Sequence, residues 1–215
     1  MTAPRANSSA RPAAVRRLPR SFFARPTLTV ARELLGQRLV RLDRGRRLSG
    51  WIVEAEAYIG PKDLACHAHV GRTARNEVMW GPAGHAYVYL TYGMHWCLNI
   101  VTEDDGYPAA VLIRGVAPDE GVGVMRRRRG RVPEAQLADG PAKVCQALGL
   151  DGGFNGHDLC ALGARLLLET PRAGPVGKVT RGPRVGLNNV PEPWKSKPWR
   201  YRWVPRRLSP KEPDR

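Results

Sequence analysis

Two carboxylates and a phenol alternate along one apolar segment of the chain. Glu54, Glu56 and Tyr58 fall within Leu48–Ile59, whose composition predicts a long strand. Side chains of a strand point alternately to its two faces. The pattern therefore predicts one face with Ile52, Glu54, Glu56 and Tyr58, and a second face with Trp51, Val53, Ala55 and Ala57.

A strand face of this kind has two interpretations, because carboxylates are rarely buried without a partner. In the first, the face is exposed and Glu54 and Glu56 pair with nearby arginines. In the second, one carboxylate is held in a cleft as a general base, and the Tyr58 ring forms an aromatic wall two residues away.

A predicted β-hairpin carries the second group of reactive side chains. Its strands are Ala86–Thr91 and His95–Val101, and alternation places Tyr87 and Tyr89 on one face. The tip, Tyr92-Gly93-Met94, points an aromatic ring and a methionine toward solvent, which is unfavourable unless something covers them. Either the tip packs on its own domain, or it is an apolar wedge that inserts between base pairs and kinks a duplex.

The net charge favours a nucleic acid as the partner. The 215 residues contain 35 Lys and Arg against 19 Asp and Glu, a formal net charge of +16. A field of that sign attracts polyanions and speeds encounter with them. The run Arg126–Arg129 is expected to be a solvated helix end, with phosphate contacts as the alternative.

Composition argues against several other classes of protein. The four cysteines form no CxxC pair, and the neighbouring Cys66, His67 and His69 are poorly spaced for a tetrahedral ion, so no metal or cofactor is expected. No apolar run approaches the roughly 18 residues of a membrane span, and the first residues lack a signal-peptide core. We expect a cytoplasmic protein with reduced thiols, associated with the nucleoid in a bacterium.

Three regions are expected along the chain: a disordered basic arm over 1–20, one folded domain over 21–204, and a polar tail over 205–215. The expected strands are Gln37–Leu42, Leu48–Ile59, Ala86–Thr91, His95–Val101, Ala109–Arg114, Leu166–Glu169 and Val176–Thr180. The expected helices are Thr27–Leu35, Pro118–Met125 and Pro141–Leu148. Strands joined by hairpins, with helices around them, predict a single α+β domain on a mostly antiparallel sheet.

Several motifs, taken in order over residues 20–204, are more specific than any one of them. They are Val53 to Pro61, Asp63 to His67, Gly71 to Asn76, Tyr87 to Asn99, Val111 to Arg114, Gly140 to Lys143, and Arg184 to Gly186. With this set the chain resembles the alkyladenine (3-methyladenine) DNA glycosylase family. The resemblance implies that family's α+β fold with a protruding β-hairpin.

The resemblance also implies a role for individual residues. Glu56 would be the base that deprotonates the attacking water, Arg114 would hold that water and a phosphate, and the main chain of Val185 would share the water. The base pocket would be made by Tyr58, Ala65, His67, Tyr89, Asn99 and Leu112, with Asn99 clashing with the exocyclic amine of normal guanine. Intercalation would fall to Tyr92 and Met94, and contacts with the DNA backbone to Arg72, Arg75, Tyr87 and Lys143.

The activity implied is base-excision repair. Such an enzyme flips alkylated or deaminated purines (3-methyladenine, 7-methylguanine, and also hypoxanthine or ethenoadenine) out of double-stranded DNA and hydrolyses the N-glycosidic bond, leaving an abasic site. No lysine stands in the matched pocket, so a monofunctional glycosylase is expected, acting as a monomer.

Two other functions fit part of the sequence. A non-enzymatic nucleic-acid-binding protein would need the charge and the Tyr92 tip but not Glu56. A sugar hydrolase could use Glu54 and Glu56 as an acid/base pair, but both would lie on the same side of a substrate. His67, likewise, has a structural alternative as a hydrogen-bonding residue.

Overall fold

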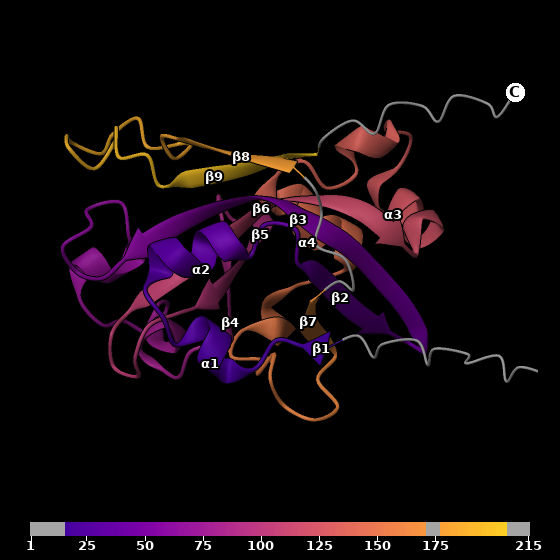
Figure 1. Ribbon diagram of the computed structural model, residues 1–215, viewed down its shortest axis with the longest axis horizontal. Helices are drawn as coiled ribbons and strands as arrows, with labels where there is room; N and C mark the ends of the chain where they lie inside the picture. Colours follow the sequence, from indigo (N-terminus) through magenta and orange to yellow (C-terminus); the bar gives the residue numbers. More distant parts are fainter. Residues whose placement is uncertain (1–15, 171–176, 206–215) are drawn as a thin grey trace, which may run out of the picture.

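A twisted antiparallel sheet runs through the whole domain (Figure 1). In this computed structural model, residues 16–170 and 177–205 are described. Their strands form a nine-stranded sheet in the order β1-β7-β2-β3-β6-β5-β4, and β9 joins β3 and carries β8. The strands are β1 (Arg16–Arg17), β2 (Arg38–Asp43), β3 (Arg46–Ile59), β4 (Ala86–Thr91), β5 (His95–Val101), β6 (Ala109–Glu120), β7 (Leu166–Thr170), β8 (Gly177–Gly182) and β9 (Arg200–Pro205).

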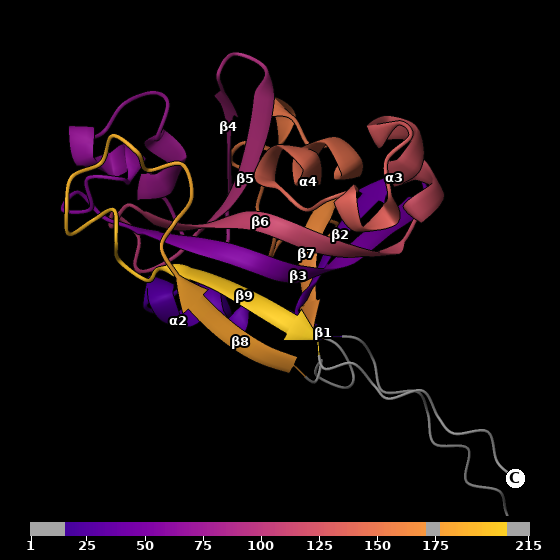
Figure 2. The same ribbon diagram turned by 90° about the horizontal axis from the view of Figure 1, so that it is seen from above.

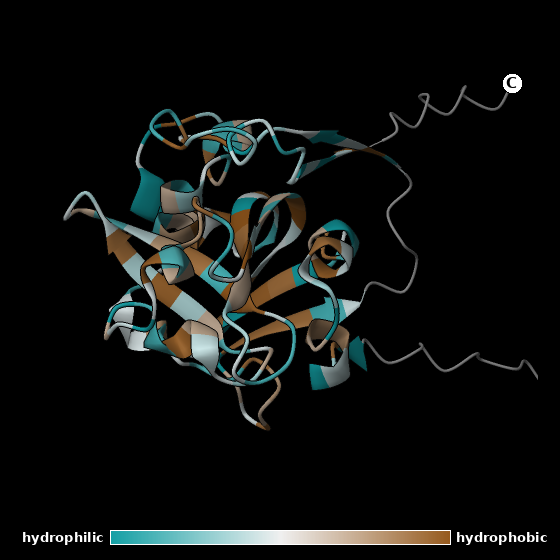
Figure 3. Cartoon of the chain, turned by 90° about the vertical axis from the view of Figure 1, so that its left-hand side faces the viewer, coloured by the Kyte–Doolittle hydropathy of each residue, from teal (hydrophilic) through white to brown (hydrophobic). Residues whose placement is uncertain are grey.

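Helices cover both faces of the sheet. The α-helices are α1 (Arg20–Phe23), α2 (Thr27–Glu33), α3 (Val122–Arg129) and α4 (Pro141–Leu148), and the 3₁₀ turns are η1 (His67–Val70), η2 (Glu77–Trp80), η3 (Glu134–Gln136) and η4 (Gly152–Phe154). Figure 2 shows α2 on one side of β3 and β6, and α3 and α4 on the other. The apolar side chains of α2 and α4 meet those of the strands in one buried core. Hydrophobic residues accordingly concentrate on the central strands in Figure 3. No helix in the described ranges is long and apolar enough to cross a membrane.

The long strand β3 holds the centre of the sheet because it has neighbours on both edges. It pairs with β6 along nearly its whole length, with β2 in its first half, and with β9 at Glu54, Ala55 and Glu56. Glu54 and Glu56 therefore lie in the interior of the sheet, with a strand on each side.

The β3–β6 pairing contains three register shifts, and the two on either side of Glu54 bear on the expected strand faces. Val53 is an extra residue on β3, and Arg114 is an extra residue on β6 one step further on. Each bulge shifts the alternation by one residue. Ile52 consequently packs in the core with Ala55 and Ala57, and the expectation that it shares a face with Glu54 is wrong.

Most expected elements are confirmed, including α2, α4 and the hairpin of β4 and β5, and the α+β class is confirmed. The helix expected to open at Pro118 exists as α3, but its expected start is wrong, because β6 continues through Glu120 and α3 begins at Val122. Glu120 accepts hydrogen bonds from Ser49 and Arg47 of β3, and the left-handed Gly121 (φ 72°) ends the strand. Proline, aspartate and glutamate are common at a helix start, but here pairing with β3 keeps Pro118 to Glu120 in the strand.

The boundaries of the folded part also differ from expectation at the first residues. Arg16 and Arg17 pair with β7, and Arg20 opens α1, so residues 16–20 belong to the domain and not to a basic arm. Residues 1–15 and 206–215 lie outside the described residues. Of the expected strand Val176–Thr180, residue 176 lies outside them as well, and β8 occupies Gly177–Gly182.

Candidate active site

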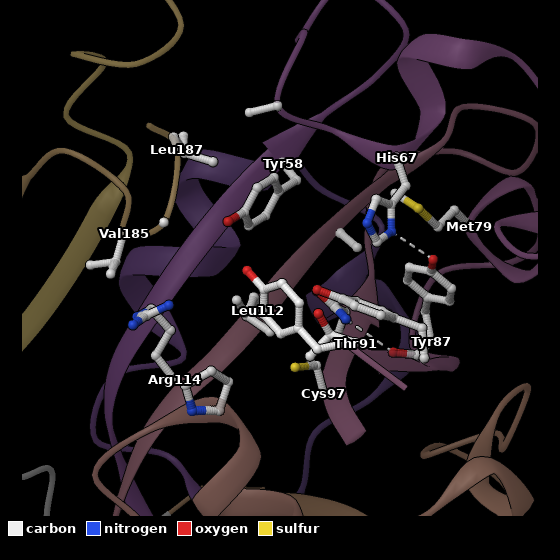
Figure 4. Close-up of a pocket in the computed structure, with 17 residues that line it drawn as sticks. Tyr58, His67, Met79, Tyr87, Thr91, Cys97, Leu112, Arg114, Val185 and Leu187 are labelled. Carbon is white, nitrogen blue, oxygen red and sulfur yellow. Dashed lines mark hydrogen bonds between the residues drawn. The ribbon is translucent and has the colours of Figure 1, made fainter. Parts of the chain in front are cut away.

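A cavity of about 280 Å³ opens between the β4–β5 hairpin, the end of β3 and the loop that precedes β9. Figure 4 shows 17 residues that line it, with Tyr58 and Arg114 on the side nearest Val185. All six residues expected to form a base pocket are among them: Tyr58, Ala65, His67, Tyr89, Asn99 and Leu112. Met79, Cys97 and Leu187 also line the cavity, and the sequence did not single them out.

Three aromatic rings form one wall of the cavity. The His67 and Tyr89 ring centroids are 4.6 Å apart at an interplanar angle of 74°, and the Tyr87 and Tyr89 centroids are 5.3 Å apart at 33°. Burial, aided by the charge of Arg75, lowers the pKa of His67 to about 4. His67 is therefore a neutral ring at neutral pH.

Tyr87 belongs to this wall and not to a DNA-contacting surface. Its side chain is 1% exposed, and its hydroxyl lies 2.8 Å from Nδ1 of His67. A hydroxyl buried in this way is not presented to a phosphate at the surface, so the structure gives no support to the expected contact of Tyr87 with the DNA backbone. The hydroxyl is instead within hydrogen-bond distance of His67.

The floor of the cavity is set by strand register. Asn99 of β5 lies opposite Leu112 of β6, and its side-chain amide donates to the carbonyl of Tyr87 at 3.2 Å. Asn99 is 4% exposed and is held in one orientation. A fixed polar group at the floor can reject ligands of the wrong outline.

Glu56 lies directly behind the other wall. It is fully buried, and its neighbours Tyr58, Arg114 and Val185 line the cavity. The Val185 amide donates to Oε1 at 2.7 Å, and the Tyr58 hydroxyl donates to Oε2 at 2.9 Å. Burial raises the pKa of this carboxyl group, and the cation of Arg114 opposes the rise. The cation offsets only part of the effect of burial, so the Glu56 carboxylate is more basic than an exposed one.

Arg114 reaches both acids of β3 because it is the bulged residue of β6. Its Nε lies 3.2 Å from Oε1 of Glu54 and 3.4 Å from Oε1 of Glu56. Glu54 also contacts Arg200 at 3.4 Å and Arg202 at 3.7 Å. Both interpretations of this face therefore hold in part: Glu54 is an acid paired with arginines, and Glu56 is a carboxylate beside a cleft. Glu54 is not available as the second acid of a sugar hydrolase.

A buried ion pair closes the site from behind. Arg184 donates to both carboxylate oxygens of Asp63, at 2.5 and 2.9 Å, and both side chains are fully buried. The Arg184 guanidinium also lies 4.7 Å from the centroid of the Tyr58 ring. No pattern in the sequence indicates this contact, because the two residues are 121 positions apart.

The hairpin tip stands clear of the domain (Figure 2). Tyr92 is 86% exposed and Met94 is 68% exposed, so the alternative in which the tip packs on its own domain is wrong. Tyr92 adopts a left-handed conformation (φ 50°) and lies at the mouth of the cavity. This placement puts an aromatic ring beside the opening.

The cations expected at the DNA backbone differ in their availability. Arg72 is tied to Glu77 at 2.5 Å, and Lys143 to Asp139 at 2.8 Å, both at the surface. Arg75 lies over the Tyr89 ring at 5.3 Å and is the one nearest the aromatic wall.

The arginines Arg126–Arg129 at the end of α3 were expected to be solvated, but three of them contact other parts of the protein. Arg128 donates to Asp43 at 2.7 Å, Arg129 donates to the carbonyl of Leu137 at 3.0 Å, and Arg126 pairs with Glu134. These contacts anchor α3 to β2 and to the segment around η3.

In the Cys66-His67-Ala68-His69 segment, His67 lines the cavity, and Cys66 and Ala68 are buried in the core beside it. Burial raises the pKa of the Cys66 thiol to about 12, and all four cysteines are free. Within residues 16–170 and 177–205, no group of three or more His, Cys, Asp or Glu side chains could hold a metal ion.

Comparison with known proteins shows the family to which the chain belongs. The methylpurine-DNA glycosylase (MPG) family matches residues 21–206. Putative 3-methyladenine DNA glycosylases of Methanocella arvoryzae and Myxococcus xanthus are each 50% identical, over 86% and 87% of this chain and 90% and 89% of theirs. One of Carboxydothermus hydrogenoformans is 49% identical over 80% of this chain and 88% of its own. The chain belongs to the methylpurine-DNA glycosylase family. It is accordingly a DNA glycosylase, a hydrolase of N-glycosidic bonds.

Proposed function

We propose that this glycosylase removes alkylated and deaminated purines from duplex DNA, with a water activated by Glu56. The observation that carries the proposal is the position of Glu56, a buried carboxylate of raised pKa directly behind an aromatic cavity. The substrates proposed are 3-methyladenine and 7-methylguanine, with hypoxanthine and ethenoadenine as neutral counterparts.

The cavity suits a flat, electron-poor ring. At about 280 Å³ it is at the small end of ligand pockets, which span roughly 300–1,000 Å³. An extruded base would stack on Tyr89 and His67, a contact worth about 1–3 kcal/mol per base. An alkylated purine carries positive charge, which the faces of Tyr58 and Tyr89 attract. Because His67 is neutral, it does not repel such a base.

Hydrolysis needs a base near the sugar carbon and a counter-charge for the oxocarbenium-like transition state. Glu56 supplies both. Its raised pKa increases its affinity for a proton, and its negative charge stabilises the oxocarbenium-like sugar. The water loses a proton to Glu56 and its oxygen bonds to C1′, while the bond to the purine nitrogen breaks and its electron pair leaves with the base. The Val185 amide and Arg114 fix the carboxylate through hydrogen bonds to its two oxygens.

Extrusion of the base would leave a gap in the duplex. We propose that Tyr92, at the cavity mouth, and Met94, two residues further along the exposed tip, fill this gap. The net charge of +16 draws the enzyme to DNA, so binding should weaken steeply with added salt.

A panel of duplexes, each with a single lesion, tests the proposal. Free base is measured after incubation with wild type and with Glu56→Gln, and binding is measured for both. We expect Glu56→Gln to bind the duplexes but to release base about 100-fold or more slowly, the range for loss of a general base. Unchanged release would reject the role of Glu56, and absent release from wild type would favour a non-enzymatic DNA-binding protein.

A further inference from the structure

A second cavity, of about 580 Å³, lies far from the base pocket. It is enclosed by β2, the turn into β3, α3 and the segment that leads to β7. Figure 2 shows α3 and β2 at one end of the molecule and the loop before β9 at the other. Six arginines but only two aspartates line this second cavity. None of these residues belongs to the site described above.

The inner part of the second cavity holds more positive charge than its acids balance. Arg41 and Arg128 share the single carboxylate of Asp43, at 3.5 and 2.7 Å. Arg165 forms no ion pair with any described residue, and its guanidinium lies 5.2 Å from the centroid of the Phe154 ring. Arg41 lies over the same ring at 4.5 Å. Three guanidinium groups and the two carboxylates of Asp43 and Asp151 thus line this part of the cavity, which leaves a positive charge unbalanced.

Arg41 is also left with an unused donor. Its side chain is 9% exposed, and its Nε is buried without a hydrogen-bond partner among the described residues. A buried donor without a partner is unfavourable, because it has lost its hydrogen bonds to water. Burial lowers the pKa of Arg41, and Arg165 and Arg128 lower it further against the opposing effect of Asp43. An anion in the second cavity would add negative charge beside Arg41 and oppose this lowering of its pKa.

The rim of the second cavity carries further arginines that could bind an anion. Arg44 and Arg46 on the turn and Arg127 on α3 are exposed and form no ion pair within the described ranges. A guanidinium presents five donors in a planar fork that matches two oxygens of a phosphate. The rim and the inner cluster together form a cationic pocket.

We infer that this cavity binds a phosphate group. The phosphate could come from the backbone of the bound duplex or from a free anion, and the backbone case rests on the proposed function. β3 runs from Arg46 at this cavity to Tyr58 at the base pocket, twelve steps or roughly 40 Å at 3.3 Å per residue. One helical turn of DNA is about 34–36 Å. A duplex seated at the base pocket and running along β3 would bring a phosphate to the second cavity about one turn away.

The test compares two triple variants of equal charge. Arg46→Ser/Arg127→Ser/Arg165→Ser removes exposed cations of the second cavity. Arg16→Ser/Arg32→Ser/Lys178→Ser removes three exposed cations that line neither cavity. Two properties are measured for wild type and both variants: the affinity for lesion duplexes of about 10 and about 30 base pairs, and the rise in Tm with inorganic pyrophosphate at constant ionic strength.

If the phosphate belongs to DNA, the cavity variant should bind the long duplex about tenfold or more weakly than the control variant, and the short duplex equally well. If it is a free anion, pyrophosphate should raise the Tm of wild type and control but not of the cavity variant, with no difference between the duplexes. A cavity variant that matches the control in both measurements overturns the inference. Base release from the short duplex reports on Glu56 separately, so failure of the proposed function would be recognised independently.

Discussion

Arg184 and Asp63 form a fully buried bidentate ion pair that joins the loop before β9 to the segment after β3. Arg184 also donates to the carbonyls of Ala57 and Trp194, and Asp63 accepts the amide of Ala65. The residue after Arg184 is Val185, whose amide holds Glu56. The pair therefore fixes two walls of the active site at once.

Removing one charge of this pair should destabilise the protein. In Asp63→Asn the buried Arg184 keeps its charge without a counter-ion, and loss of one partner of a buried pair costs about 3–5 kcal/mol. Urea unfolding measures the free energy of unfolding. Glu77→Gln, which breaks the exposed pair with Arg72, is the matched control and should leave the midpoint unchanged. Equal midpoints for the two variants would contradict this role.

Glu56 should make the protein less stable as the pH rises. Burial gives it a higher pKa in the folded state than in the unfolded chain. Its contribution to stability is then greatest below the unfolded pKa and is lost as the pH rises through the folded one. Glu56→Gln cannot ionise, so it should resist urea better than wild type at neutral pH, and the difference should shrink toward acid pH. Urea midpoints across this range check the sign, and a variant less stable than wild type at neutral pH contradicts it.

Tyr92 should matter for duplex substrates and not for stability. The ring is 86% exposed, so Tyr92→Ala should leave the Tm unchanged. Base release from a duplex should fall about tenfold or more, because the extruded state loses the side chain that fills the gap. Release from a single-stranded lesion substrate, which needs no extrusion, serves as the control. Equal losses on both substrates would place Tyr92 in base binding and not in intercalation.

Asn99 should set the discrimination against normal guanine. Its side chain is fixed at the pocket floor by the carbonyl of Tyr87, where it would meet the exocyclic amine of that base. Asn99→Ala should raise the release of guanine from undamaged duplex about 10- to 100-fold, while release of 7-methylguanine changes less. Release of the two bases is compared for wild type and variant. An unchanged ratio would remove Asn99 from substrate selection.

The sequence predicted the parts of this site that depend on local pattern. Alternation along β4 placed Tyr87 and Tyr89 together, and the tip residues placed Tyr92 in solvent. The bulges at Val53 and Arg114 could not be predicted, because neither a valine nor an arginine in a strand indicates whether it has a partner on the next strand.

Long-range contacts were equally invisible in the sequence. The hydroxyl of Tyr87 faces His67 and not a phosphate, which depends on how η1 packs against the sheet. The contact of Arg184 with Asp63 depends on the chain returning across the sheet to β9. Tertiary packing decides such contacts, and neither propensity nor periodicity encodes it.

The pairing of β9 with β3 at Glu54, Ala55 and Glu56 has a consequence for biosynthesis. A nascent chain that has emerged only as far as β7 already contains the aromatic wall and Glu56, but not Val185 or Arg184. The carboxylate then lacks the amide that orients it until the final strand docks. We therefore expect the ability to cleave the N-glycosidic bond to appear last during translation, after the surfaces proposed to bind DNA have formed.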